Sequence, residues 1–328
     1  MSHKVVLTDH VFPEESLVAQ VRIQAGVDLE VHHIHDEDGL IEITRDADAV
    51  LVEMAHITRR VIQNMTRCRL IGRHGVGYDT LDVDAATDAG IMVCNVTDYS
   101  TSEVADHAVS MLLALARSLL AADREVRAGG WDVFAACGKN RRIDGQTLGI
   151  VGLGKIGQAV AKRGAGFGLN LVGYDPYIPA EAMEAFGVRK MELDDLLRVS
   201  DLVSVHVPLS ASTHHLMNAD RIALMKPTAF LVNTSRGGLV DLAALTVALQ
   251  EGRLGGAGLD VFEKEPPARD DPLLQLPNVI VSPHAGFYSQ GSLLDLHTRQ
   301  AKQVAAVLAG NRPDNLLNPS VLERTRGL

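Results

Sequence analysis

A glycine-rich stretch between an apolar run and an amphipathic run is the feature that most constrains the fold of this chain. It reads Val-Gly-Leu-Gly-Lys-Ile-Gly over residues 151–157, and apolar side chains recur at helical spacing over residues 156–167. The pattern predicts a strand, a tight turn and a helix. Gly152 permits the turn, Gly154 lets a ligand approach the backbone closely, and Gly157 lets the helix pack on its strand. Because a helix N-terminus offers unpaired N–H groups, the stretch predicts a dinucleotide pyrophosphate site.

An acidic residue follows this joint at the distance that a ribose-binding carboxylate requires. Asp175 comes directly after a second strand-like run, Asn170–Tyr174. Its distance from the glycines is close to the spacing of about 20 residues expected of such an acid. A carboxylate there accepts hydrogen bonds from both ribose hydroxyls and repels a 2′-phosphate. The predicted cofactor is therefore NAD rather than NADP, although Asp175 on its own could also be a turn residue ahead of Pro176.

Length and composition set the protein class. The 328 residues suffice for two domains, and 46% hydrophobic with 22% charged residues is typical of a soluble globular protein. A net charge of −10 without a basic stripe argues against nucleic acid. The three cysteines lack C-x-x-C spacing, and no apolar run reaches about 18 residues. With a strand-like Lys4–Thr8 at the start and no leader, we expect a cytoplasmic protein without membrane association.

Short apolar runs alternate with helical stretches along the whole chain, which predicts an α/β protein with two doubly wound parallel sheets. The predicted boundaries are residues 1–100 for the first segment of a substrate-binding domain, 101–290 for an NAD-binding Rossmann domain, and 291–328 for the segment that returns to the first domain. One long helix is predicted from Ser102 to about Arg127, and a final helix from Gly291 to Ala309. We expect the substrate in a cleft between the domains.

Three polar residues follow successive strands of the second block, where open α/β sheets bind ligands. Arg236 can hold a carboxylate through two parallel hydrogen bonds. His284 can take the hydroxyl proton of an alcohol while hydride leaves to NAD, and an acid such as Glu265 would orient the imidazole and favour its protonated form. Taken alone, each residue is more readily explained as a surface or loop residue. Their order after a dinucleotide motif favours oxidation of a hydroxy acid.

With these residues the chain resembles the D-isomer-specific 2-hydroxyacid dehydrogenases. This family includes phosphoglycerate dehydrogenase, glyoxylate/hydroxypyruvate reductase, D-lactate dehydrogenase and the C-terminal-binding-protein corepressors. The resemblance covers nearly the whole chain. It rests on the segments 73–79, 151–157, 206–213, 231–241, 258–267 and 282–286. It implies a Rossmann NAD-binding domain inserted into a flavodoxin-like substrate domain.

The resemblance also implies roles for individual residues. Arg236, Glu265 and His284 would form the catalytic set. Arg73 with the backbone N–H groups of Val76 and Gly77 would bind the substrate carboxylate. The implied cofactor contacts are Val104, Gly152, Gly154, Lys155, Ile156, Gly157, Asp175, His206, Val207, Pro208, Thr213, Thr234, Ser235, Asp260, near the nicotinamide amide, and Gly286.

Several alternatives stay open at this stage. Asp106 and the Phe287–Ser289 segment favour the corepressor-like branch, so an NAD-responsive dimeric binding protein competes with an enzyme, as does a dehydrogenase of another small anion. The apolar run from Val109 to Leu115 in the long helix predicts a homodimer. The cluster His32, His33 and His35 lacks the ligand spacing of a metal site, and no metal is expected.

Overall fold

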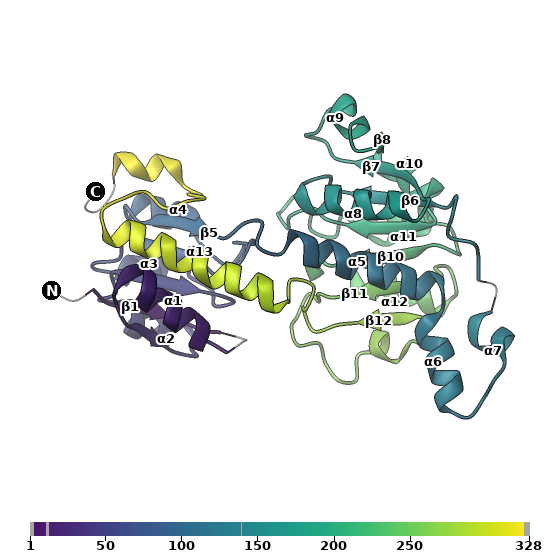
Figure 1. Ribbon diagram of the computed structural model, residues 1–328, viewed down its shortest axis with the longest axis horizontal. Coiled ribbons are helices and arrows are strands. Elements are labelled where there is room, and N and C mark those ends of the chain that lie inside the picture. Colours follow the sequence, from purple (N-terminus) through teal and green to yellow (C-terminus); the bar gives the residue numbers. More distant parts are fainter. Residues whose placement is uncertain (1–2, 11–12, 139, 325–328) are drawn as a thin grey trace. The chain divides into compact units, whose positions relative to one another are not determined.

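The computed structural model describes residues 3–10, 13–138 and 140–324 (Figure 1). The chain divides into two compact units. Met1–Tyr99 and Ser289–Leu328 form the first unit, and Ser100–Tyr288 form the second. Both are α/β units built on parallel sheets, which confirms the fold class predicted from the sequence.

The first unit is a five-stranded parallel sheet in the order β2-β1-β3-β4-β5, the flavodoxin-like order. Its long C-terminal helix α13 lies beside α1 and packs against β4 (Figure 1). The strands are β1 (Val5–Leu7), β2 (Leu29–Val31), β3 (Ala49–Val52), β4 (Leu70–Arg73) and β5 (Met92–Asn95). The helices are α1 (Glu15–Ala25), α2 (Glu37–Thr44), α3 (Arg59–Asn64), α4 (Val83–Asp88) and α13 (Gln290–Leu308), with a 3₁₀ turn at Pro319–Glu323.

A buried carboxylate shapes the loop that follows β3. Asp9 has no exposed surface, and its oxygens accept hydrogen bonds from the N–H groups of Glu53 (3.1 Å), Met54 (2.6 Å) and Ala55 (3.1 Å). A buried charge is tolerated only when such donors replace water. Asp9 therefore holds the backbone of residues 53–55 in one conformation at the carboxyl edge of the sheet.

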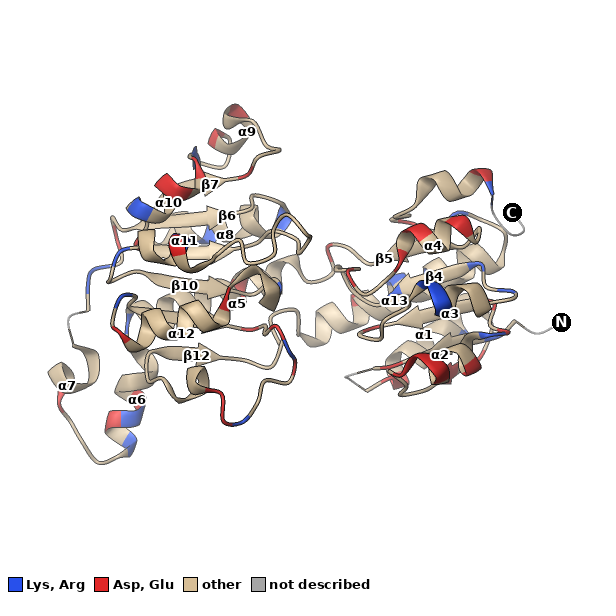
Figure 2. Ribbon diagram, turned by 180° about the vertical axis from the view of Figure 1, so that it is seen from behind, with Lys and Arg blue, Asp and Glu red and all other residues tan. Residues whose placement is uncertain are grey.

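Charged side chains on the surface of this unit pair with one another. Figure 2 shows acidic α2 next to basic residues of α3. Arg60 of α3 donates to Glu37 at 2.8 Å and to Asp38 at 2.6 Å. Arg60 is thus matched by acids of α2, whereas Arg59 pairs with Asp82 at 3.7 Å and Asp88 at 3.2 Å, at the two ends of α4.

The second unit is a seven-stranded parallel sheet in the order β12-β11-β10-β9-β6-β7-β8, so the strand order reverses between β6 and β9. Ligands of open α/β sheets bind beyond the carboxyl ends of the strands at such a switch point. The strands are β6 (Thr147–Val151), β7 (Asn170–Tyr174), β8 (Arg189–Lys190), β9 (Leu202–Val205), β10 (Phe230–Asn233), β11 (Gly256–Leu259) and β12 (Val279–Val281). The helices are α5 (Thr101–Ala116), α6 (Leu119–Arg127), α7 (Val133–Cys137), α8 (Lys155–Gly166), α9 (Ala180–Glu184), α10 (Leu193–Val199), α11 (Ala219–Leu224) and α12 (Leu242–Gln250), with 3₁₀ turns at Gly237–Leu239 and Pro272–Gln275.

The prediction of a single long helix from Ser102 to about Arg127 is wrong. Ser118 adopts a left-handed backbone conformation with φ 50°, which ends α5 and turns α6 by 61°. No residue of α6 is buried. In the described part of the chain no single helix has the length and hydropathy of a membrane span, and α5 and α6 pass such a test only as a bent pair.

The apolar run of α5 does not form an exposed surface. It therefore gives no support to the homodimer that was predicted from it. Val109, Met111, Leu112 and Leu115 are only 7%, 5%, 2% and 7% exposed. They belong to a core cluster of the second unit, where α5 packs on α8, β10 and β11. The run is apolar because it fills this core.

Candidate active site

The glycine loop joins β6 to α8 at the switch point of the sheet. Gly152 has φ 93°, and a Cβ there would lie 2.8 Å from the carbonyl of His206, which follows β9. A Cβ at Gly157 would lie 2.1 Å from the carbonyl oxygen of Gly152. Both positions therefore require glycine, Gly152 for conformation and space and Gly157 for the approach of the helix to its own loop.

Gly154 differs from the other two because nothing in the fold itself requires it. It is the N-cap of α8 with no side-chain cap, and a Cβ there would meet no protein atom within 4 Å. Lys155 and Ile156 open the helix at the same point. A bare helix N-terminus with room for close approach fits a pyrophosphate, whose charge the N–H groups would bind.

Asp175 lies at the end of β7, beside the glycine loop. One carboxylate oxygen accepts from the N–H of Leu153 at 3.0 Å and the other from the N–H of Tyr177 at 2.9 Å. Each oxygen keeps a second lone pair. The carboxylate can therefore accept the two ribose hydroxyls of a dinucleotide, so the residues present fit NAD.

The loops after β9 and β10 are tied to each other. The Ser235 hydroxyl joins them by donating to the carbonyl of Val205, the last residue of β9, at 2.9 Å. Within the loop after β9, the Thr213 hydroxyl donates to the carbonyl of Pro208 at 2.7 Å. Thr234 is 8% exposed, and its buried hydroxyl has no hydrogen-bond partner in the described part of the chain. That hydroxyl remains available to a ligand.

His206 and Val207 stand where β9 ends, against Gly152. The Nε2 of His206 lies 2.8 Å from the Ser204 hydroxyl. Burial lowers the pKa of His206 to about 4, so the imidazole is neutral at pH 7. It contributes a hydrogen-bonding wall rather than a positive charge to this edge of the sheet.

The structure brings two of the three predicted catalytic side chains into direct contact. The Nδ1 of His284 lies 2.7 Å from a carboxylate oxygen of Glu265, and the other oxygen accepts from the N–H of Phe262 at 2.9 Å. Burial acts to raise the pKa of Glu265, but the hydrogen bond and charge of His284, the Phe262 N–H and the charge of Arg236 outweigh it and lower that pKa. Glu265 is therefore a carboxylate at neutral pH. It accepts the Nδ1 proton of His284 and leaves Nε2 as the atom that can exchange a proton.

Arg236 stands between β10 and the following 3₁₀ turn. Its carbonyl accepts from the Asn233 side chain at 2.8 Å, and its guanidinium donates to the carbonyl of Ser235 at 2.9 Å. A Cβ at the next residue, Gly237, would lie 1.9 Å from the backbone of Phe262. This close approach holds the loop that carries Arg236 against the segment that leads to Glu265.

Asp260 organises the loop that carries His284. Its carboxylate is 2% exposed and accepts from the N–H groups of Ala285 and Gly286, both at 2.8 Å, and from the Ser282 hydroxyl. Its carbonyl accepts from the N–H of His284 at 2.8 Å. Burial opposes ionisation, but the nearby ring of His107 and the donors from Ser282, Ala285 and Gly286 outweigh it and lower the pKa of Asp260 to about 2. The bonds hold His284 at a left-handed φ of 53°.

His107 of α5, which was not among the residues predicted from the sequence, completes this arrangement. Its Nε2 lies 2.8 Å from the Ser282 hydroxyl and 3.5 Å from Asp260 Oδ1. Val104, one turn earlier on α5, is 8% exposed. No spacing in the sequence signals a contact between residues so far apart in the chain, and only the packing of α5 reveals it.

The predicted substrate residues lie in the first unit, after β4. Arg73 is 8% exposed, and its guanidinium donates to the carbonyl of His74, so it braces its own loop. Val76 is 42% exposed. In the described part of the chain, the N–H groups of Val76 and Gly77 donate to no protein acceptor. Two adjacent N–H groups of this kind suit an anion.

The histidine cluster lies elsewhere in the first unit. The His33 ring meets His10 and His35 edge-on, with centroids 5.7 and 5.0 Å apart. Within residues 3–10, 13–138 and 140–324, no group of three or more His, Cys, Asp or Glu side chains is placed to hold a metal ion.

Comparison with known proteins places this geometry in a family. Residues 109–286 match the NAD-binding domain of D-isomer specific 2-hydroxyacid dehydrogenases. D-3-phosphoglycerate dehydrogenase of Methanocaldococcus jannaschii is 42% identical over 89% of this chain, which spans 56% of that enzyme's length. Glyoxylate reductase of Korarchaeum cryptofilum is 42% identical over 87% of the chain and 86% of the relative. D-lactate dehydrogenase of Aquifex aeolicus, solved with NAD and lactic acid, superimposes with a TM-score of 0.84 at 31% identity, covering 94% of this chain and 96% of that one.

Two independent lines therefore agree. The glycine loop and Asp175 fit NAD, and the matched segment is the NAD-binding domain of one enzyme family. The relatives in that family are dehydrogenases and reductases of small hydroxy and keto acids. This chain belongs to the D-isomer-specific 2-hydroxyacid dehydrogenase family and, like its relatives, is an NAD-dependent oxidoreductase.

Proposed function

We propose that the protein interconverts a small D-2-hydroxy acid and its 2-keto acid. The observation that carries this proposal is the 2.7 Å contact between His284 and Glu265 at the carboxyl edge of the NAD-binding sheet. An imidazole backed by a carboxylate is the acid–base pair that such a reaction needs. The names of the relatives, glyoxylate reductase, phosphoglycerate dehydrogenase and D-lactate dehydrogenase, support the substrate class.

Each residue then has one task in keto-acid reduction. Bound NADH supplies the hydride. His284 donates the Nε2 proton to the substrate carbonyl oxygen, and Glu265 keeps the proton-carrying tautomer and stabilises the imidazolium. In the second unit, the guanidinium of Arg236 can bind a carboxylate. For the first unit, we propose that the N–H groups of Val76 and Gly77 bind the substrate carboxylate. Asp260 and Ser282 keep the His284 loop in place.

A panel of 2-keto acids tests the proposal. Glyoxylate, hydroxypyruvate, pyruvate, phenylpyruvate and 3-phosphohydroxypyruvate are each mixed with the protein and NADH, and nicotinamide absorbance is followed. We expect at least one to be reduced, with D configuration in the product. If none is reduced by a folded, NADH-binding protein, the proposed reaction is wrong and a binding role becomes the better account.

The cofactor preference should depend on Asp175. We expect NADH to bind more tightly than NADPH, since a carboxylate at the ribose repels a 2′-phosphate. Asp175→Ala should reduce the ratio of the NADPH to the NADH dissociation constant by about tenfold or more. Fluorescence titration with both cofactors measures this, and Asp175→Asn is the matched control that keeps an acceptor for the Leu153 N–H. Equal affinities in the unmodified protein would contradict the prediction.

Arg236→Lys should mainly weaken substrate binding. A lysine ammonium is a point charge and cannot form two parallel hydrogen bonds to a carboxylate. We expect the keto-acid KM to rise by about tenfold or more while NADH affinity stays within about twofold. Steady-state kinetics with the best keto acid measure both, and Arg198→Lys, a surface ion-paired residue of α10, serves as control. An unchanged KM would show that Arg236 does not bind the substrate carboxylate.

We also propose a homodimer whose interface lies on residues 119–134, which include α6 and the start of α7. Leu119, Trp131, Val133 and Phe134 are 61%, 89%, 63% and 82% exposed in this segment. Several large exposed apolar side chains within one short segment are typical of a subunit interface. We expect a dimeric mass by sedimentation at micromolar concentration and a monomeric one after Trp131→Ser with Phe134→Ser. Tyr177→Ser, at another highly exposed aromatic residue, is the control, and a monomeric unmodified protein would refute the proposal.

A further inference from the structure

The buried face of α13 carries polar side chains where packing alone would favour apolar ones. Gln300 and Gln303 are 0% and 3% exposed, while Leu296, Val304 and Val307 on the same helix supply apolar packing. A buried amide costs free energy unless its hydrogen bonds are made, and a fully bonded one enforces a unique geometry. The amides of these glutamines are therefore expected to fix a hydrogen-bonded geometry that the apolar side chains cannot fix.

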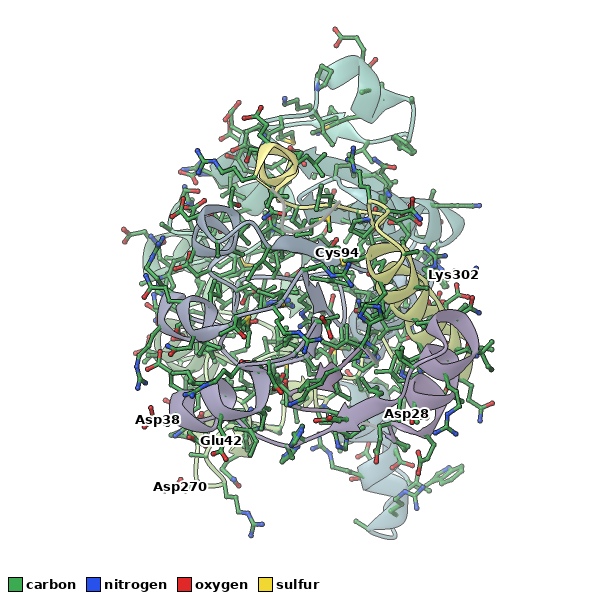
Figure 3. The ribbon with its side chains drawn as sticks, turned by 90° about the vertical axis from the view of Figure 1, so that its left-hand side faces the viewer. Asp28, Asp38, Glu42, Cys94, Asp270 and Lys302 are labelled. Carbon is green, nitrogen blue, oxygen red and sulfur yellow. The ribbon has the colours of Figure 1, made fainter. Side chains whose placement is uncertain are left out.

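The amide of Gln303 is saturated with partners. Its oxygen accepts from Gln300 Nε2 at 3.0 Å and from the Cys94 thiol at 3.1 Å. Its nitrogen donates to the carbonyls of Asn95 at 2.9 Å and Asp314 at 3.0 Å. Figure 3 labels Cys94 in the interior of the unit and Lys302, the neighbour of Gln303, at its periphery. Two donors on the oxygen and two acceptors on the nitrogen leave only one orientation for this amide.

From Gln303 the hydrogen bonds lead to the loop after β4. The Asn95 carbonyl, which accepts from Gln303, shares its peptide plane with the N–H of Val96. That N–H donates to the carbonyl of Gly75 at 3.0 Å. The Gly75 carbonyl in turn shares its peptide plane with the N–H of Val76. Because a peptide unit is planar and trans, fixing the carbonyl also fixes the direction of the N–H on the opposite side.

A second link fixes the neighbouring peptide. The side-chain nitrogen of Asn95 donates to the carbonyl of Val76 at 2.6 Å. This carbonyl belongs to the same peptide unit as the N–H of Gly77. The two successive peptides that carry the proposed substrate donors are thus held through their carbonyls, one by the Asn95 side chain and the other by the Val96 N–H. Gln303 in turn holds the peptide unit that joins Asn95 to Val96.

Close packing leaves little freedom in this arrangement. A Cβ at Gly72 of β4 would lie 2.4 Å from Gln300 Nε2, so α13 approaches the strand that leads into the loop as closely as glycine allows. The ring of His74, the residue after β4, stacks on His297 of α13 with ring centroids 5.2 Å apart. The helix, β4 and β5 therefore form one hydrogen-bonded support beneath residues 75–77.

We propose that Gln303 and Asn95 are positioning residues that aim the N–H groups of Val76 and Gly77 at the substrate carboxylate. The inference rests on the proposed function, because it assigns that carboxylate as the ligand of the loop. The N–H groups bind the carboxylate alike in ground state and transition state. Their misalignment therefore changes KM and leaves turnover at saturation nearly intact.

Gln303→Met tests this. It keeps the length and volume of the side chain and removes both donors. We expect the keto-acid KM to rise by about fivefold or more, with kcat and NADH affinity within about twofold. Gln24→Met, at an exposed position of α1, is the matched control. Asn95→Asp replaces the donor to the Val76 carbonyl with a carboxylate that repels that carbonyl, and should have the same selective effect on KM, with Asn64→Asp on α3 as its control. If Gln303→Met does not fold, the keto-acid KM of Asn95→Asp decides whether the N–H groups of Val76 and Gly77 are positioned in this way.

Amide hydrogen exchange gives a readout independent of activity. Because the Val96 N–H bonds to Gly75, a peptide covering residues 93–97 should exchange faster in Gln303→Met, while one covering β1 should not. Faster exchange with a selective rise in KM supports the proposal. A folded variant with unchanged KM and unchanged exchange overturns it, as does an equal loss of kcat, KM and NADH affinity. If the unmodified protein reduces no keto acid, the proposed function fails, and exchange at residues 93–97 alone then decides whether Gln303 positions the loop.

Discussion

Replacing His284 with alanine is expected to lower keto-acid turnover by about two to four orders of magnitude while NADH affinity stays nearly unchanged. The imidazole is the group whose Nε2 can exchange the substrate proton, because Nδ1 is held by Glu265 at 2.7 Å. The loop itself should persist in the variant. Its backbone bonds from residues 284–286 to Asp260 do not involve the imidazole.

Single-turnover and steady-state kinetics with NADH measure the loss, and titration of NADH fluorescence measures the affinity. His35→Ala, at an exposed histidine of the first unit, is the control and should retain full activity. Intact turnover in His284→Ala would show that another group transfers the proton. A parallel loss of NADH affinity would show instead that the cofactor site had been disturbed.

Replacing Glu265 with glutamine is expected to shift the pH dependence of keto-acid reduction and to lower the rate at neutral pH by about tenfold or more. Glu265 has a lowered pKa and is ionised across the neutral range. A carboxylate next to an imidazole favours the protonated ring, which keto-acid reduction requires. Without that charge the proton-donating form of the pair is less stabilised, so the alkaline limb of the profile should move toward acid and the loss should grow as pH rises.

A pH series of kcat/KM for the unmodified protein and the variant measures the shift. Glu263→Gln is a close control, since Glu263 lies two residues away and contacts His215 at 3.3 Å instead of His284. For hydroxy-acid oxidation, which begins with the neutral ring, the variant should be affected less than for reduction. An unshifted alkaline limb would mean that Glu265 has only a structural role.

Much of the second unit could be predicted from the sequence because its signals are local. The strand, glycine turn and helix over residues 147–166 are read from neighbouring residues, and the turn at Gly152 needs a φ of 93° that glycine adopts without strain. Asp175 follows from the same short unit. The order of Arg236, Glu265 and His284 after successive strands is also visible in the chain, since parallel strands present their carboxyl ends at one edge.

The pattern of apolar residues was a poorer guide where burial, rather than periodicity, decided the outcome. One apolar periodicity runs through residues 102–127, yet the left-handed Ser118 splits it into α5 and α6. A run such as Val109–Leu115 looks alike whether it meets a partner or its own sheet. Only the packing of α5 on β10 and β11 showed that the core takes it.

The sequence by itself thus determined the fold class, the dinucleotide loop and the candidate acid–base residues, because each depends on residues close together in the chain. Only the tertiary structure decided what holds those residues in place. His107 reaches Ser282 across 175 positions, and Gln303 reaches Asn95 across 208. Hydrogen bonds of this kind have no periodicity and no fixed spacing. They exist because the folded sheets and helices bring buried polar groups together, and burial makes an unbonded group costly.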